Sequence, residues 1–251
     1  MTRVLANAVD ADGLAMVGSG VLEVASQRPV LSPSFEPRAE STLARTLRDV
    51  AATLPGARGG VVAVGEFRGP WGVPDLAVLS PAKVEQRLAC DVPPLLSQQE
   101  CRLVAAATRW IGPECLARAA RVSSASAERS LRRLVSVGAL ELRGGRLRRD
   151  PGVVPLGRLW AIEAKVEEWQ GGLAQAHRYR LWADGAVLVL GRARVPHKKI
   201  AERARHYQVG LVVEGRWISR PRLVPPNAAT RLHASEHMLA ALIGPKGASH
   251  P

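Results

Sequence analysis

Apolar residues recur along the chain with two spacings, and each spacing predicts one kind of secondary structure. Helical spacing follows Pro37, where the apolar positions are Leu43, Leu47, Val50 and Leu54. Apolar runs at 60–67 and 73–79 flank a turn-rich segment, so they predict the two strands of a hairpin. Shorter apolar pieces within 13–30 predict another hairpin.

The second half of the chain alternates strand-like and helix-like patterns. The predicted elements are strand 159–164, helix 167–183, strand 186–190, helix 198–207, strand 210–213 and helix 235–242. Such alternation is typical of α/β proteins, in which helices cover a central sheet. We therefore expect an α/β fold with a mixed central sheet flanked by helices.

Residues 97–150 interrupt this alternation. Their pattern predicts helices at 97–110, 113–120 and 125–137, followed by two short strands around Gly144 and Gly145. Three helices and a two-stranded hairpin follow the order of a winged helix-turn-helix, an all-α-plus-wing domain whose third helix enters the DNA major groove.

Arginines gather on the two elements of this unit that normally touch DNA. They are Arg129, Arg132 and Arg133 on the third helix, and Arg143, Arg146, Arg148 and Arg149 on the wing. The guanidinium fork suits guanine edges and phosphate oxygens, so these residues predict a DNA-binding surface. The alternative is a solvated helix face with a wing that contacts protein partners.

Proline-rich breaks suggest how the domains divide the chain. We expect one α/β domain in two parts, 1–80 and 156–220, with the winged helix-turn-helix at 95–150 inserted between them. Residues 221–251 would form a C-terminal extension. A loop between two strands is a place where an insertion is well tolerated.

The chain is strongly basic. Its formal net charge is +13 and its pI is near 11, which favours polyanionic partners, although an arginine-rich codon bias would give the same balance. No stretch is long and uncharged enough to span a bilayer, and the three cysteines are isolated, without the spacing of a metal site. We expect a soluble cytoplasmic protein, nucleoid-associated if it is bacterial, with no membrane partner.

Two acidic residues and a lysine fall on predicted strands. Residues two apart on a strand share a face, so Glu163 and Lys165 point the same way and Ala164 points into the core. With Asp75 on another strand, Glu163 would hold a hard cation, which neutralises phosphate charge and acidifies a water molecule. Lys165 would then orient that water, lower its pKa or stabilise charge on the phosphate.

Two further carboxylates are candidates for the same site. If the turn of the first hairpin is centred on Pro70 and Trp71, Glu66 lies opposite Asp75 and becomes an auxiliary carboxylate. Glu40 lies in the first turn of the predicted first helix, where it could reach the site or simply favour the helix N-terminus.

Gln175 and Tyr179 lie one turn apart on the predicted helix 167–183. They are therefore neighbours on the helix surface, and both could reach a site at the strand ends. An amphipathic helix with a buried tyrosine and a surface glutamine would have the same spacing.

The order of these residues resembles the PD-(D/E)XK, or restriction-endonuclease-like, nuclease superfamily. The matching parts are Glu40, Pro74-Asp75, Glu163-Ala164-Lys165 and the pair Gln175 and Tyr179, which is similar to the QxxxY pair of the RecB-like branch. The resemblance covers roughly residues 37–80 and 158–215. It implies Mg²⁺ or Mn²⁺ bound by Asp75, Glu163 and the Ala164 carbonyl, with Lys165 in the catalytic position.

These features together predict a Mg²⁺-dependent deoxyribonuclease, an endonuclease targeted to duplex or branched DNA by its winged helix. The main rival is a non-catalytic DNA-binding regulator that keeps a nuclease-like fold as a scaffold. A subunit that recruits protein partners through the wing is a third alternative. Cutting both strands would need a homodimer or two successive events, and the sequence leaves this open.

Overall fold

The computed structural model describes residues 14–17, 21–24, 43–57 and 60–243, and it divides into two compact units. The sheet unit comprises the described residues up to Pro81 together with Arg158–Pro226. The helical unit comprises Ala82–Gly157 and the described residues from Asn227 onward. The segment expected as a separate C-terminal extension therefore belongs largely to the helical unit.

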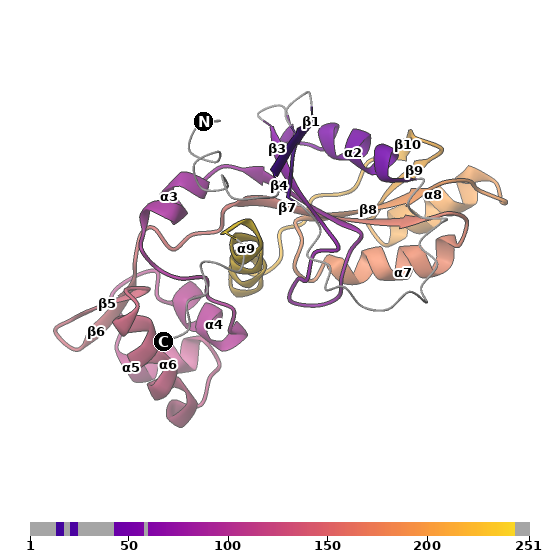
Figure 1. Cartoon of the computed structure of the whole chain (residues 1–251). Coiled ribbons are helices and arrows are strands. Elements are labelled where there is room, and N and C mark those ends of the chain that lie inside the picture. Colours follow the sequence, from indigo (N-terminus) through magenta and orange to yellow (C-terminus); the bar gives the residue numbers. More distant parts are fainter. Residues whose placement is uncertain (1–13, 18–20, 25–42, 58–59, 244–251) are drawn as a thin grey trace, which may run out of the picture. The chain divides into compact units, whose positions relative to one another are not determined.

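A mixed sheet runs through the sheet unit (Figure 1). Within the described residues it has eight strands in the order β1-β2-β3-β4-β7-β8-β9-β10. The strands are β1 Leu14–Val17, β2 Val21–Val24, β3 Val61–Gly65, β4 Leu76–Pro81, β7 Gly157–Lys165, β8 Gly185–Leu190, β9 Gly210–Val213 and β10 Arg216–Ser219. Strands β7, β8 and β9 run parallel, whereas β3 and β4 pair antiparallel. The expected α/β class with a mixed sheet is confirmed.

The buried strands owe their position to their composition. All six residues of β8, Gly-Ala-Val-Leu-Val-Leu, are buried, as expected for a parallel strand that is covered on both faces. Strand β10 was not predicted from the sequence, because its four residues Arg-Trp-Ile-Ser are exposed or only half-buried and show no apolar run.

Helices cover both faces of the sheet. Helix α2 (Ala44–Ala52) lies on one face, where Val50 joins a buried cluster with Trp160 and Ile162 of β7. Helix α7 (Trp169–Tyr179) lies on the other, and a Cβ on its Gly172 would come within 2.7 Å of the Leu188 side chain. This close approach requires glycine. Helix α8 (His197–His206) packs against β9 and β10.

The helical unit contains the three helices and the hairpin expected at 97–150. Its elements are α3 Val84–Ala89, α4 Gln98–Ala106, α5 Pro113–Ala119, α6 Ser124–Ser136, β5 Leu140–Arg143, β6 Arg146–Arg149 and α9 Ala228–Ile243. Ser97 caps α4, Pro113 takes the first position of α5, and Gly138 leaves α6 with a φ of +77°.

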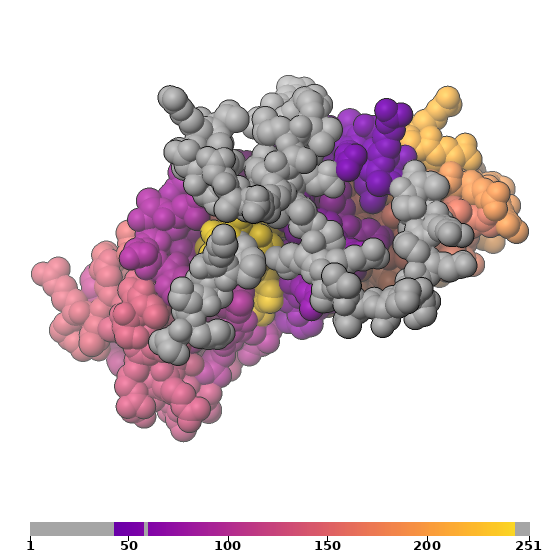
Figure 2. Space-filling view, in the orientation of Figure 1, coloured from indigo at the N-terminus to yellow at the C-terminus, as the bar shows by residue number. Residues whose placement is uncertain are grey.

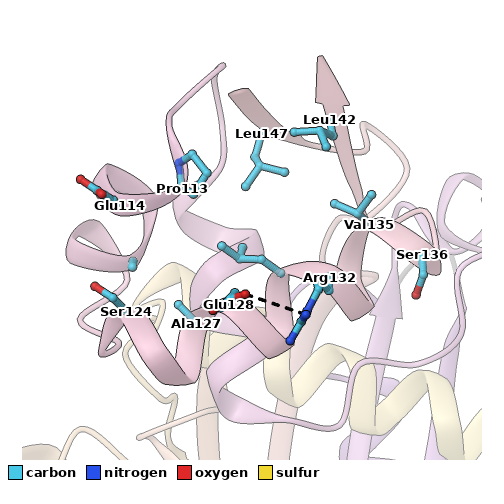
Figure 3. A pocket seen from close by; sticks show the side chains of 12 residues that line it. Pro113, Glu114, Ser124, Ala127, Glu128, Arg132, Val135, Ser136, Leu142 and Leu147 are labelled. Atoms are coloured by element: carbon cyan, nitrogen blue, oxygen red, sulfur yellow. Dashed lines mark ion pairs between the residues drawn. The ribbon is translucent and has the colours of Figure 1, made fainter. Parts of the chain in front are cut away.

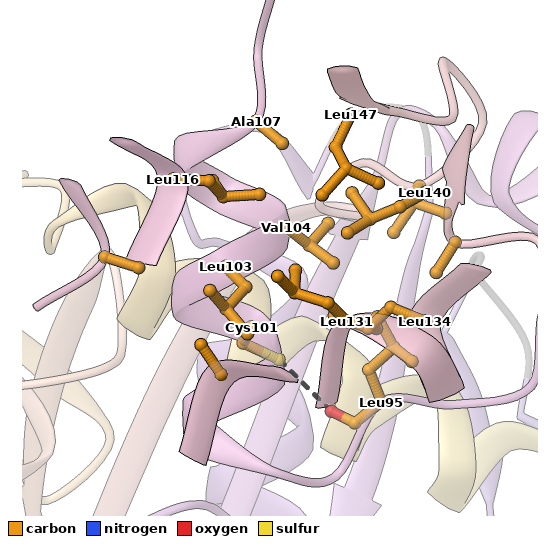
Figure 4. Close-up of a cluster of buried hydrophobic side chains, with 14 of the residues drawn as sticks. Leu95, Cys101, Leu103, Val104, Ala107, Leu116, Leu131, Leu134, Leu140 and Leu147 are labelled. Carbon is orange, nitrogen blue, oxygen red and sulfur yellow. Dashed lines mark hydrogen bonds between the residues drawn. The ribbon is translucent and has the colours of Figure 1, made fainter. Parts of the chain in front are cut away.

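Leucines from α4, α5, α6, β5 and β6 fill one core (Figure 4). Leu103, Leu116 and Leu134 come from α4, α5 and α6, and Leu147 closes the cluster from β6. The Cys101 thiol donates a hydrogen bond to the carbonyl of Leu95 at 3.2 Å. Burial raises the pKa of this thiol far above its usual range, so Cys101 is a structural residue rather than a nucleophile.

Helix α9 packs against α4 and contributes Leu232 to this core. It is longer than the predicted helix 235–242, because its buried positions include polar residues that obscure the apolar pattern. One of these, Ser235, accepts a hydrogen bond from the Leu156 N–H at 2.7 Å. Another, Glu236, pairs with Arg87 of α3 at 2.7 Å, and both side chains are at least 99% buried.

None of the helices in the described segments is both long and apolar enough to cross a lipid bilayer.

Candidate functional site

Two carboxylates that are far apart in the sequence meet on the sheet face covered by α7. Asp75 directly precedes β4, and Glu163 lies on the adjacent strand β7. The Ala164 N–H donates a hydrogen bond to Oδ2 of Asp75 at 2.7 Å, although the two residues are 89 positions apart. The predicted convergence of Asp75 and Glu163 across the long insertion is therefore present.

Both carboxylate oxygens of Glu163 are engaged. Nζ of Lys165 lies 2.8 Å from Oε1, and the hydroxyl of Tyr179 donates to Oε2 at 2.9 Å. The Glu163 side chain is only 3% exposed, whereas that of Lys165 is 20% exposed. Glu163 and Lys165 share a strand face, as their spacing predicts. Lys165 is the more solvent-accessible residue of the two.

The surroundings of Glu163 disfavour its charge. Burial raises the pKa of this carboxyl group, and the negative charge of Asp75 raises it further, while Lys165 and Tyr179 act in the opposite direction. A cation bound between the two carboxylates would relieve this repulsion. The site is therefore electrostatically suited to a divalent cation.

Tyr179, like Lys165, contacts the Glu163 carboxylate. Burial and the neighbouring Glu163 carboxylate raise the pKa of the Tyr179 phenol far above its usual range, so it stays protonated and remains a donor. Its hydroxyl also lies 3.0 Å from the carbonyl oxygen of Val73. Tyr179 thus links α7 both to β7 and to the loop before Asp75.

The donor set fits magnesium or manganese. Mg²⁺ prefers oxygen ligands and is commonly held by one or two carboxylates while it keeps several water molecules. Among the described residues, no group of three His, Cys, Asp or Glu side chains could hold a metal ion. The fit therefore rests on Asp75 and Glu163, and the Ala164 carbonyl stays a predicted third ligand.

Three further residues were predicted for the site: Glu66, Gln175 and Glu40. The Glu66 N–H donates to the Asp75 carbonyl at 3.0 Å, so the backbone register is the predicted one, but Glu66 ends the strand with a φ of +47°. Gln175 is half-buried on α7, and no described residue forms a hydrogen bond with its side chain. Glu40 lies outside the described residues. The roles of all three stay predictions.

Sequence reasoning missed the indole of Trp182 as a partner of the loop before Asp75. Its Nε1–H donates to the carbonyl of Trp71 at 2.9 Å, and its ring lies 6.0 Å from that of Tyr179. The only signal was that Trp182 follows Tyr179 by three residues, which is the spacing of neighbours on a helix.

The arginines of the helical unit do not share one environment. Arg129, Arg132, Arg143 and Arg146 are exposed, and the turn between β5 and β6 projects from the surface of its unit (Figure 2). Arg133, in contrast, forms an ion pair with Glu100 of α4 at 2.5 Å. Arg148 pairs with Glu141 at 3.0 Å and lies over the Trp110 ring, while Arg149 is half-buried.

A pocket of about 510 Å³ opens between α5, α6 and the β5–β6 hairpin (Figure 3). Its lining is mainly apolar and includes Leu142, which is 58% exposed. Glu128 and Arg132 also line it, and they form an ion pair at 3.8 Å. This side of α6 therefore combines apolar surface with an ion pair that includes Arg132, one of the predicted DNA-binding arginines.

Comparisons of the chain with protein-family models, with curated proteins and with solved structures found no match.

Proposed function

We propose that the protein is a metal-dependent deoxyribonuclease of the PD-(D/E)XK type, an endonuclease that hydrolyses phosphodiester bonds. The observation that carries the proposal is the contact of Lys165 with Glu163 at 2.8 Å beside Asp75. A purely structural sheet has no need for two carboxylates with mutual repulsion and a lysine on one face, and perturbed carboxyl groups of this kind cluster at functional sites.

Asp75 and Glu163 would hold Mg²⁺ or Mn²⁺, with the Ala164 carbonyl as the third ligand. The bound cation would neutralise phosphate charge and acidify a water molecule. The protein fixes both carboxylates in advance, Asp75 through the Ala164 N–H and Glu163 through Tyr179. This preorganisation avoids reorientation of the ligands during the reaction.

Lys165 has room to change partner when a substrate binds. Its ammonium group is partly exposed, and a cation on Glu163 would weaken its attraction to Oε1. The ammonium would then donate to the attacking water or to a phosphate oxygen. The water oxygen would form a bond to phosphorus and lose a proton to solvent, the bond from phosphorus to the leaving oxygen would break, and the leaving oxygen would take up a proton from solvent.

The helical unit would bring the enzyme to duplex or branched DNA. Support comes from the exposed Arg129 and Arg132 on α6 and Arg143 and Arg146 on the hairpin, elements whose order along the chain is that of a winged helix-turn-helix. These cations would contact phosphates and groove edges. Arg133 and Arg148 already have carboxylate partners within the unit, so they support the DNA contact less directly.

The alternative is a non-catalytic DNA-binding regulator with a nuclease-like scaffold. A subunit that recruits protein partners through its wing is a third alternative, and the apolar pocket beside α6 favours that one. The deciding experiment incubates linear, nicked, branched and single-stranded DNA with the protein and Mg²⁺ or Mn²⁺. Asp75→Ala and Lys165→Ala should abolish cleavage, whereas Glu202→Ala, an exposed carboxylate on α8, should leave it unchanged. DNA left intact by the wild-type protein under every condition would refute the enzyme proposal.

A further inference from the structure

The loop of residues 67–74 connects β3 to β4 and ends at Asp75. Its inner side rests on aromatic rings: Phe67 is 1% exposed and its ring lies 5.6 Å from that of Trp182. A Cβ on Gly69 would lie 2.9 Å from the Phe67 ring and 3.3 Å from the Trp182 ring. The loop therefore packs closely on these rings, and its backbone leaves no space for a side chain at position 69.

Contacts with Trp182 and Tyr179 fix the backbone on both sides of Gly72. The Trp182 indole N–H donates a hydrogen bond to the Trp71 carbonyl at 2.9 Å, and the Tyr179 hydroxyl, which donates to Glu163, lies 3.0 Å from the Val73 carbonyl oxygen. Gly72 itself has a φ of +79°, and a Cβ there would lie 2.8 Å from the Tyr179 ring. The loop is thus a fixed platform, and Tyr179 connects it directly to Glu163.

The outer side of this platform presents large apolar side chains to solvent. Trp71 is 39% exposed and Val73 is 53% exposed, only a few residues before Asp75. A tryptophan has a wide flat face with few rotatable bonds, so it can bind another ring at low entropic cost. Arg68 in the same loop and Arg178 on α7 are also exposed, which adds positive charge near the platform.

We infer that Trp71 stacks on an unpaired base of the DNA strand whose phosphodiester enters the site at Asp75 and Glu163. The inference rests on the proposed nuclease function and narrows its substrate to DNA with a single-stranded or flapped segment at the cut. Base faces are occupied by neighbours inside a duplex and become accessible to an aromatic side chain only when the base is unpaired. The exposed guanidinium groups of Arg68 and Arg178 suit phosphate oxygens, which favours nucleic acid over an apolar protein partner.

Binding can be measured separately from cleavage when EDTA is present. The full-length protein is titrated into labelled single-stranded DNA, flapped duplex and blunt duplex, and fluorescence anisotropy gives each Kd. Trp71→Ala should weaken binding to the single strand and the flap about 5- to 150-fold and change blunt-duplex binding less than about twofold. Trp71→Phe should retain most of the affinity, and Leu181→Ala, which alters another exposed apolar residue, should change none of the three Kd values.

A second readout reports stacking itself. 2-Aminopurine in the unpaired segment loses fluorescence when an aromatic ring stacks on it, so the wild-type protein should quench it and Trp71→Ala should not. Equal binding and equal quenching by both proteins would overturn the inference, as would a wild-type protein that binds neither the single strand nor the flap. If the wild-type protein cleaves DNA but Trp71→Ala changes neither binding nor quenching, only the stacking inference is refuted. If DNA binding depends on Trp71 but the wild-type protein does not cleave DNA, only the nuclease proposal is refuted.

Discussion

The hydroxyl of Tyr179 donates a hydrogen bond to Oε2 of Glu163 at 2.9 Å and lies 3.0 Å from the carbonyl oxygen of Val73. This one side chain therefore couples the carboxylate to the loop that precedes Asp75. A hydrogen bond to the ionised form of a carboxyl group favours that form, so Tyr179 counteracts part of the pKa increase that burial imposes on Glu163.

Tyr179→Phe removes this donor and keeps the ring. The pKa of Glu163 should rise further, because its charged form loses a partner while its burial is unchanged. If an ionised Glu163 holds the metal, the acidic limb of the pH–activity profile should move to higher pH. Measurement of kcat/KM for DNA cleavage from about pH 5 to 9 tests this shift.

The same variant should lose about 1.5–3 kcal/mol of unfolding free energy, the range for a hydrogen bond to a charged group. Tyr207→Phe, at the residue that follows the last turn of α8, serves as the control for loss of a phenol. An unchanged pH profile in Tyr179→Phe would show that Glu163 does not depend on this hydroxyl.

Lys165→Met separates metal binding from chemistry. The ammonium group competes with a metal ion for Oε1 of Glu163, so its removal should strengthen Mn²⁺ binding measured by calorimetry. Cleavage should nevertheless fall about 100-fold or more, as for loss of one electrostatic contributor to a transition state. Asp75→Asn should lower both the affinity for Mn²⁺ and the rate of cleavage. Weaker Mn²⁺ binding by Lys165→Met would contradict the competition between Lys165 and the metal ion for Oε1 of Glu163.

Glu163 should also make stability depend on pH. Its pKa is raised in the folded state, so its contribution to stability is present below the unfolded pKa and is lost as pH rises through the folded pKa. In EDTA, the free energy of unfolding of the wild type should therefore fall relative to Glu163→Gln over that interval, by about 1.4 kcal/mol for each unit of pKa difference. Mg²⁺ should restore the lost stability in the wild type but not in Glu163→Gln. If urea unfolding gives the same dependence of stability on pH for both proteins in EDTA, the prediction is refuted.

Local patterns predicted most elements of the fold. Apolar runs such as that of β8 and the helical spacing around Leu131 and Leu134 depend only on neighbours in the chain, and the corresponding elements are present. Strand β10 and the start of α9 were missed, since their residues are exposed or are polar groups satisfied by distant partners. Such partners leave no local pattern.

For the site as well, local spacing predicted some relationships between residues and packing between distant segments determined the others. Residue spacing placed Glu163 and Lys165 on one strand face, and it gave the register that sets Glu66 opposite Asp75. The hydrogen bond from Ala164 to Asp75 and the link from Trp182 to Trp71 depend on packing between distant segments. The sequence also gave no indication that Arg133 would be held by Glu100.

The arginines of α6 should differ in what they contribute. Arg132 has a 75% exposed side chain, and within the described part of the chain its one ion pair is a long contact with Glu128, so Arg132→Ala should weaken DNA binding without a loss of stability. Each lost phosphate contact should reduce the slope of log K against log salt by about 1. Anisotropy titrations at several salt concentrations measure both effects, and Arg102→Ala on α4 is the matched exposed control.

Arg133→Ala should instead lower stability by about 1–3 kcal/mol, because Glu100 is only 8% exposed and would lose a charged partner. If Arg132→Ala leaves DNA affinity and salt dependence unchanged, α6 does not contact DNA. A protein-binding role for the pocket beside it would then gain support.

The buried pair of Arg87 and Glu236 should decide whether α9 is integral to the helical unit. Two hydrogen bonds of 2.9 and 2.7 Å join the side chains, and Glu236 also accepts from the Leu95 N–H. Glu236→Leu leaves a buried guanidinium without its carboxylate, so it should cost about 3–5 kcal/mol in urea unfolding. The exposed pair of Arg148 and Glu141 is the control, and its disruption should cost less than about 1 kcal/mol.

The double variant Arg87→Met with Glu236→Leu should be more stable than the sum of the single changes predicts, because no charge is left buried alone. It should not reach wild-type stability, since the Leu95 N–H and the Val92 carbonyl also lose their partners. Additive losses would mean that the two charges are not coupled. A Glu236→Leu protein with wild-type stability would show that α9 contributes little to the fold of the helical unit.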